Sequence, residues 1–132
     1  MTKEDNLQEL ISELQSAGIK HNPKEIIKAI RLSDGKIIFL EQGNRKSGLQ
    51  HILERHGVDF MNRGIAYHRI AEVIIKAIIE GEIIGKQGET RNIYQFVFDG
   101  TVQHISIDIG TNGYIVGANP TPRKLMSLLR QE

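Results

Sequence analysis

The sequence contains no cysteine and no tryptophan. The lack of cysteine excludes disulfide bonds, thiolate nucleophiles and cysteine-ligated zinc sites. Long hydrophobic runs are also missing: the apolar stretches reach only about four residues, whereas a membrane-spanning helix needs about 20. The first ten residues, MTKEDNLQEL, have neither a basic region nor an apolar region after it. We therefore expect no membrane span and no signal peptide in this sequence.

The remaining composition is that of a soluble globular domain, with 39% hydrophobic and 25% charged residues in 132. There is no internal repeat and no linker-like tract, so residues 1–132 are expected to form a single domain. The net charge of +1 is unevenly spread. Residues 1–13 hold one lysine and four acidic side chains, so the rest of the chain is mildly basic. That balance permits a polyanionic partner without requiring one.

The N-terminal region, residues 1–20, predicts a helix. Its apolar residues recur at helical spacing and a glycine follows them: Leu7, Leu10, Ile11, Leu14 and Gly18. Residues 21–81 predict a helical half that begins ambiguously. Asn22 and Pro23 are typical of a helix start, but SDG followed by KIIFLE is typical of a β-hairpin. The hairpin is the favoured interpretation.

Two helices are predicted in the rest of that half. The stretch SGLQHILERHG predicts a short helix capped by Ser47 and ended by Gly57. Its buried stripe is expected to consist of Leu49, Ile52 and Leu53. The stretch HRIAEVIIKAIIEG predicts a more apolar helix that ends at the glycine.

The chain changes character after Gly81. Segments rich in β-branched and aromatic residues (EIIGK, RNIYQFVF, TVQHISIDI and GYIVGA) alternate with the turn sequences QGE, DG and TNG. Residues 82–119 therefore predict an antiparallel meander of about four strands. Residues 120–132 predict a tail with a short helix after Pro122. Helices followed by strands indicate an α+β fold, with N-terminal helices packed on a twisted antiparallel sheet.

The predicted helix around residue 51 concentrates side chains suited to catalysis. His51 and Arg55 are four residues apart and share a helix face, and His56 lies one step further round. Histidine can act as acid or base near neutral pH, and arginine binds phosphate. Such a set suits metal-independent phosphodiester cleavage, in which one group deprotonates a ribose 2′-hydroxyl and another protonates the leaving 5′-oxygen. From the pattern alone, a solvated polar helix face is the favoured alternative.

Other catalytic motifs are absent. The spacing of His51 and His56 does not place two zinc ligands on one helix face, and no HExxH occurs, so neither a metal site nor a cofactor is predicted. The stretch GKQGET lacks the spacing of a phosphate-binding loop, and no GxSxG occurs. Alternation places His104, Ser106 and Asp108 on one strand face, where a half-exposed polar surface is the favoured interpretation.

The strands offer further candidates. Arg91 opens its strand, where it could reach into a cleft. Tyr94 could bind a phosphate or stack on a base, but packing in the core beside Phe96 and Phe98 is an equally good interpretation. The segment ANPTPRK supplies groups suited to phosphate contact, or equally a helix cap followed by solvated charges: Asn119, Thr121, Arg123 and Lys124.

The order of these segments resembles a known superfamily. KIIFLEQGNRKSGLQHILERHG, an apolar helix and RNIYQFVFDGTVQHISIDIGTNGYIVGANPTP follow one another as in nuclease toxin domains of the barnase–EndoU–colicin–RelE superfamily. More narrowly, the chain resembles C-terminal toxin domains of contact-dependent inhibition and other bacterial polymorphic toxin systems. The resemblance covers roughly residues 20–122, and its most specific part is GLQHILERH joined to NGYIVGANP.

The resemblance implies a fold, an activity and partners. The fold would have helices on one side of a twisted antiparallel sheet and an active cleft on the other side or along the edge. The activity would be metal-independent cleavage of RNA, often transfer RNA (tRNA), that leaves a 2′,3′-cyclic phosphate. A cognate immunity protein would block the cleft. The domain would be exported as part of a larger effector and would act in the cytoplasm of the target cell.

The resemblance also implies a catalytic set drawn from the helix, a strand and the segment after the last strand: His51, Arg55, His56, Arg91, Tyr94 and Thr121. The family's hydroxyl residue is expected closer to the end of the last strand than Thr121, which follows GANP in this sequence. Two other functions compete with the nuclease toxin. One is a non-catalytic module that holds a protein partner on the same sheet, and the other is a metal-dependent DNA nuclease.

Overall fold

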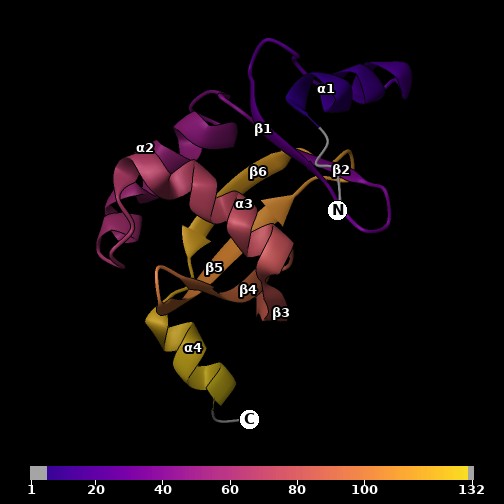
Figure 1. Cartoon of the computed structure of the whole chain (residues 1–132). Coiled ribbons are helices and arrows are strands. Elements are labelled where there is room, and N and C mark those ends of the chain that lie inside the picture. Colours follow the sequence, from indigo (N-terminus) through magenta and orange to yellow (C-terminus); the bar gives the residue numbers. More distant parts are fainter. Residues whose placement is uncertain (1–5, 131–132) are drawn as a thin grey trace.

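The computed structural model describes residues 6–130, so residues 1–5 and 131–132 of the two predicted end segments lie outside the described residues. Within the described range, the fold is α+β, as predicted, with four α-helices and two antiparallel sheets (Figure 1). The helices are α1 (Leu7–Ser16), α2 (Gly48–Met61), α3 (Ile70–Glu80) and α4 (Arg123–Arg130), and a short 3-10 helix, η1 (Tyr67–Arg69), precedes α3. One sheet pairs β1 (Ile26–Arg31) with β2 (Ile37–Glu41), and the other contains β3 (Glu82–Gln87), β4 (Arg91–Phe98), β5 (Thr101–Ile109) and β6 (Ile115–Pro120).

The four-stranded sheet is a meander in the order β3-β4-β5-β6, which confirms the predicted four strands. The turn between β4 and β5 follows from its sequence. Asp99 and Gly100 both have positive φ values, 51° and 79°, and Phe98 pairs directly with Thr101. A two-residue hairpin turn with two positive φ angles matches the right-handed twist of the strands, which explains the Asp-Gly pair.

One face of this sheet carries the main hydrophobic core. Helix α3 packs on it through Val73, Ile74 and Ala77, all fully buried, against residues of β4 and β5 such as Phe96 and Ile105. The apolar spacing of α3 thus predicts the face that it buries, and Gly81 follows its last residue as expected. Fully burying each large apolar side chain contributes about 1.5–3 kcal/mol, so this layer dominates the stability of the sheet.

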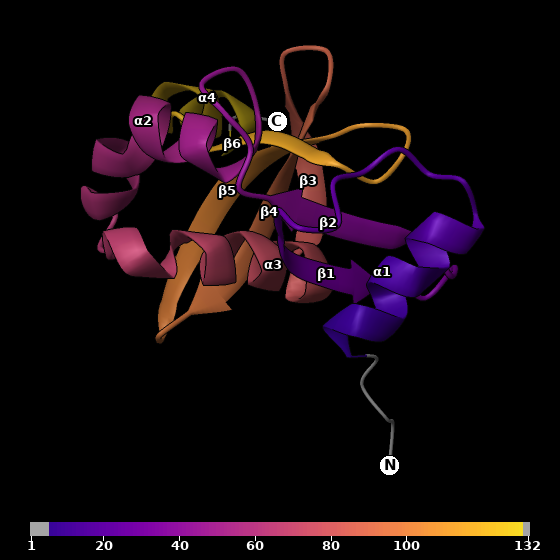
Figure 2. The same ribbon diagram turned by 90° about the horizontal axis from the view of Figure 1, so that it is seen from above.

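The N-terminal region forms a second core. The favoured hairpin is present as β1 and β2, and α1 packs on it through Leu10 and Leu14. Phe39 of β2 is fully buried in this cluster, and its backbone N–H donates to the carbonyl of Gly113 at 2.9 Å. That bond joins the hairpin to the segment before β6. Figures 1 and 2 show α1 with the hairpin at one end of the molecule, away from α4.

Helix α2 corrects one prediction. Gly57 was expected to end this helix, but the helix continues to Met61. Gly57 is buried, and a Cβ atom at this position would lie 2.8 Å from a ring carbon of Tyr67 in η1. The glycine therefore permits a close approach between α2 and η1. Ser47 has the extended backbone of a cap residue, but its hydroxyl bonds to the hydroxyl of Tyr114 at 2.9 Å instead of capping the helix.

The two faces of the four-stranded sheet are covered by different helices. Figure 2 shows α3 on one side of the four-stranded sheet and α4 on the other. Leu129 of α4 approaches Gly85 of β3 on that second side, and the predicted tail helix after Pro122 is thereby confirmed as α4. Among the described helices, none is long and apolar enough to cross a membrane.

Candidate functional site

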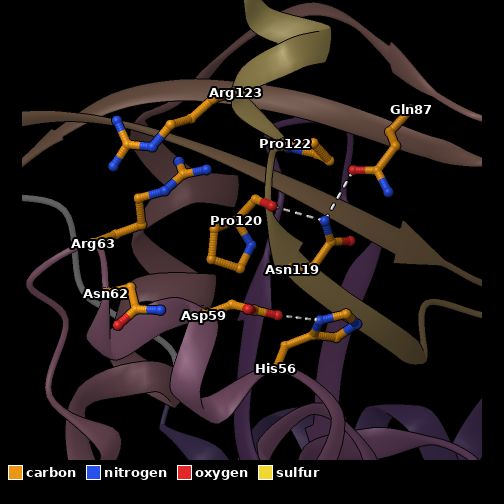
Figure 3. Close-up of a pocket in the computed structure, with 9 residues that line it drawn as sticks. All are labelled: His56, Asp59, Asn62, Arg63, Gln87, Asn119, Pro120, Pro122 and Arg123. Atoms are coloured by element: carbon orange, nitrogen blue, oxygen red, sulfur yellow. Dashed lines mark hydrogen bonds and ion pairs between the residues drawn. The ribbon is translucent and has the colours of Figure 1, made fainter.

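The face of the sheet opposite α3 borders a pocket of about 510 Å³. The pocket lies between the C-terminal half of α2, the end of β6 and the beginning of α4 (Figure 3). Seven of its nine lining residues have polar or charged side chains, and the other two are prolines. The lining residues are His56, Asp59, Asn62, Arg63, Gln87, Asn119, Pro120, Pro122 and Arg123.

A histidine–aspartate pair forms one wall. His56 and Asp59 are three residues apart on α2 and therefore share the face turned toward the pocket. The Nδ1 atom of His56 lies 2.9 Å from Oδ2 of Asp59. If Nδ1–H donates to the carboxylate, the other ring nitrogen, Nε2, is the proton acceptor of the neutral imidazole. The pair thus has the form of an oriented general base.

Two arginines form the opposite wall, and their guanidinium groups lie near one another in Figure 3. Arg63 follows α2, and its Nη2 donates to the backbone carbonyl of Thr121 at 2.7 Å. Burial lowers the pKa of Arg63, the positive charge of Arg123 lowers it further, and Asp59 partly offsets both effects. Arginine side chains stay protonated in proteins, so each contributes a guanidinium cation. The wall therefore concentrates positive charge beside the His56–Asp59 pair.

The third side of the pocket is an amide network centred on Asn119. Its Oδ1 accepts a short hydrogen bond from Nη1 of Arg91, and its Nδ2 donates to Oε1 of Gln87 at 2.9 Å and to the carbonyl of Pro120 at 2.8 Å. Asn119 is buried, so these bonds satisfy a group that would otherwise be costly to place there. They fix the guanidinium of Arg91 on the same side of the sheet as the pocket.

Thr121 lies beneath the pocket. Its side chain is fully buried, and its hydroxyl bonds to the hydroxyl of Ser106, which is also fully buried, at 2.8 Å. Its backbone N–H donates to the carbonyl of His104 at 2.8 Å. The hydroxyl that the sequence places near the phosphate is thus engaged inside the protein, where it supports the chain between β6 and α4.

The three candidate residues of the helix motif do not lie together in the structure. His56 lines the pocket, whereas His51 and Arg55 do not. His51 is hydrogen-bonded through Nδ1 to the carbonyl of Arg45 at 2.7 Å, and Arg55 is exposed to solvent. The reason is helical geometry: at about 100° per residue, positions 51 and 55 point well away from position 56.

Tyr94 lies on the other face of the sheet. It is buried in the main core with Phe96 and Phe98, so the packing interpretation describes its location. Burial raises the pKa of its phenol. The sheet lies between Tyr94 and the pocket, because alternate residues of a strand point to opposite faces. Arg91, on the opposite face of β4, is the strand candidate that the structure brings to the pocket side.

Several pocket residues were not predicted from the sequence: Asp59, Asn62, Arg63 and Gln87. The helix was expected to stop at Gly57, which left Asp59 outside it. A helix continued through the glycine to Met61 would have placed Asp59 three residues after His56, on the same face, and Arg63 just beyond the helix end. Asn119 and Arg123 line the pocket, but Asn119 lies within β6 and not after it.

The described residues contain no group of three or more histidine and acidic side chains arranged to hold a metal ion. Comparison with models of protein families and with curated proteins gives no match for this chain in either case. The chemistry of the pocket therefore carries the functional inference. An imidazole held by a carboxylate, set opposite two guanidinium groups, can move a proton beside a bound anion.

Proposed function

We propose that the chain is a metal-independent endoribonuclease domain whose active site is the pocket around His56. The observation that carries the proposal is the His56–Asp59 pair, 2.9 Å between Nδ1 and Oδ2, placed in one pocket with Arg63 and Arg123. A general base without nearby cations would not attract a phosphate ester, and cations without a base would bind the ester but not take a proton from it. Together they suit transfer of a proton next to a phosphodiester.

The proposed reaction uses an oxygen of the RNA as the nucleophile. His56 Nε2 takes the proton of a ribose 2′-hydroxyl, the 2′-oxygen forms a bond to the adjacent phosphorus, and the bond from phosphorus to the 5′-oxygen breaks. The leaving 5′-oxygen takes up a proton from the protonated imidazole or from water. The products are a 2′,3′-cyclic phosphate and a free 5′-hydroxyl. Arg63 and Arg123 stabilise the negative charge of the phosphorane.

Arg91 and its amide partners have a supporting role in this proposal. Arg91 is held by Asn119 on the pocket side of the sheet, and Gln87 holds the same amide from β3. Three strands thus contribute to a single hydrogen-bonded array beside the proposed scissile phosphate. An array whose groups are already bonded to one another needs little reorganisation during the reaction, which favours stabilisation of developing charge.

The arrangement of layers supports a place for this domain in the barnase–EndoU–colicin–RelE superfamily. A helix covers one face of a four-stranded antiparallel sheet, and the candidate site lies on the other face. With the resemblance of GLQHILERH and NGYIVGANP, this leads us to propose a toxin domain that cleaves tRNA in the cytoplasm of a target bacterium. Such a domain would be exported within a larger effector and neutralised by a cognate immunity protein.

Incubation of the purified chain with tRNA and with total RNA, each with and without EDTA, tests the activity. We expect discrete fragments with 2′,3′-cyclic phosphate ends in both conditions, and their loss in His56→Ala. His68→Ala is the matched control, because His68 is exposed on η1 and does not line the pocket. RNA that stays intact with and without divalent metal would overturn the proposal and favour a non-catalytic binding module. Cleavage that needs metal would favour the DNA-nuclease class.

A growth experiment tests the biological part separately. Expression of the chain in a bacterial cytoplasm is expected to stop growth, and His56→Ala is expected to remove that effect while the protein accumulates to a similar level. Co-expression of an open reading frame from the same locus should restore growth where that frame encodes the immunity protein. Normal growth with an RNA-cleaving chain would contradict the toxin role but leave the chemistry standing.

A further inference from the structure

A second hollow continues from the pocket. It has a volume of about 540 Å³ and shares Asn62, Arg63 and Arg123 with the first pocket. Its other walls come from β5 and α4, and we call it the α4 groove. Its further lining residues are Thr101, Val102, Gln103, His104, Met126, Ser127 and Arg130. Since three residues line both hollows, the two hollows are neighbours on the protein surface.

Positive charge predominates among the residues that line the α4 groove. The lining includes Arg63, Arg123 and Arg130 but no carboxylate. Within residues 6–130, no ion pair involves any of these three arginines. The charge of Arg123 lowers the pKa of Arg63, and an anion bound in the groove would relieve that repulsion.

His104, which lines the groove, is also affected by the positive charge of its arginines. His104 lies on β5, and its Nε2 is 2.9 Å from Oε1 of Gln95. Burial lowers the pKa of His104, and the charges of Arg130 and Arg63 lower it further. Cations from two separate segments, the end of α4 and the turn after α2, thus act on one side chain. The side chain on which they act lines the groove, and Arg130 itself is exposed to solvent.

Two of the three arginines are spaced regularly by helix α4. Arg123 and Arg130 are seven residues apart on α4, so they lie on the same face and about 10 Å apart along the helix axis. Arg63 is fixed beside Arg123 by its bond to the carbonyl of Thr121. A series of cations at intervals along a groove matches a ligand with repeated charges, such as a nucleic-acid backbone, better than a single small anion.

We infer that the α4 groove binds the phosphates of the RNA strand that flank the scissile bond. This inference rests on the proposed function, because it takes the pocket at His56 as the point of cleavage. The strand would pass over Arg63 and Arg123, which line both hollows, and run along β5 toward Arg130. The position of the groove next to the pocket favours RNA over an acidic protein surface, since an RNA strand cleaved in the pocket must extend beyond it.

RNA binding by a non-cleaving chain tests the inference directly. In a His56→Ala background, the affinity for a fluorescein-labelled single-stranded RNA of about 20 nucleotides is measured by anisotropy at several salt concentrations. Arg130→Gln is expected to weaken binding several-fold and to make the slope of log K against log salt shallower by about 0.7, as for one lost phosphate contact. Lys36→Gln removes the same charge from the exposed turn between β1 and β2 and should leave both values unchanged.

Cleavage by the otherwise unaltered chain separates the two proposals. Arg130→Gln should raise KM for long RNA and leave kcat near its original value, because the residue does not line the catalytic pocket. If Arg130→Gln binds RNA like Lys36→Gln, the groove inference is overturned even where the chain cleaves RNA, and an acidic protein becomes the better occupant. If the chain binds RNA through Arg130 but never cleaves it, the groove stands and the nuclease proposal falls. Absence of any RNA binding overturns the groove inference as well.

Discussion

The guanidinium group of Arg91 crosses β5 and lies against Gly117 of β6. A Cβ atom on residue 117 would be only 2.7 Å from Nη2 of Arg91. The strand order β4-β5-β6 means that the side chain spans a whole intervening strand to reach Asn119 and Gly117. The missing side chain at position 117 is thus what allows Arg91 to lie flat on the pocket side of the sheet.

Gly117→Ala should damage activity more than stability. The methyl group displaces the flexible end of Arg91 and not backbone, so the free energy of unfolding should change by less than about 1 kcal/mol. RNA cleavage should fall about ten- to hundredfold, because displaced positioning groups cost rate steeply. Gly85→Ala is the matched control, since its Cβ would meet Leu129 at an ordinary 3.5 Å. Equal cleavage by both variants would show that Arg91 is not needed where it lies.

The two histidines of α2 are expected to behave differently. His56→Ala should lower the cleavage rate about a hundred- to ten-thousandfold, the range for loss of a general base or acid. His51→Ala should retain most of the activity, because His51 bonds to the carbonyl of Arg45 and does not line the pocket. Single-turnover rates on one tRNA substrate measure both. A larger loss in His51→Ala than in His56→Ala would return the site to the face that the sequence suggested.

Stability should decrease when the protein is acidified, in part through His104. Burial, Arg130 and Arg63 hold the pKa of this histidine below its ordinary value in the folded state. The unfolded chain therefore binds the proton first, and stability is lost as pH falls from neutrality through the ordinary histidine range toward the lowered pKa. Urea unfolding at about pH 7.5 and about pH 5.5 measures this loss, which should be smaller in His104→Gln. His68→Gln should keep the wild-type difference, and an identical loss in all three proteins would refute the assignment.

The second core should contribute stability without shaping the site. Leu14 is fully buried between α1 and the β1–β2 hairpin, so Leu14→Ala should reduce the free energy of unfolding by about 2–5 kcal/mol. Below its unfolding temperature, the variant should cleave RNA at close to the original rate, since no residue of this cluster lines the pocket. Gln15→Ala, an exposed neighbour on the same helix, is the control for stability. Loss of cleavage in folded Leu14→Ala would show that the second core does act on the pocket.

Much of the fold follows from local patterns. The spacing of Leu10, Ile11 and Leu14 predicts the buried face of α1, and Asp-Gly predicts the turn between β4 and β5. The hairpin β1–β2 could also be favoured, because SDG supplies a turn between two apolar runs. These features depend on residues close in sequence, where periodicity and turn chemistry act directly.

The pocket depends instead on contacts between distant residues. Gly57 was interpreted as a helix stop because glycine is common there, but its actual role is a close contact with Tyr67, ten residues later. That single difference removed Asp59 from the expected helix face and left the position of Arg63, just after the helix, unpredicted. The bond from Arg91 to Asn119 likewise joins residues 28 apart in sequence. The residue pattern within either strand does not predict it.

The link between β6 and α4 consists of Thr121 and Pro122, and with Pro120 at the end of β6 they restrain the backbone there. Each proline ring fixes its own φ angle, and Thr121 is held by its hydroxyl, its N–H and its carbonyl. The conformational entropy of this segment is thus lost when the chain folds and not when a ligand arrives. A wall of the pocket is preorganised before any substrate is present. Loosening it, as in Pro122→Gly, would transfer that entropic cost to the binding step.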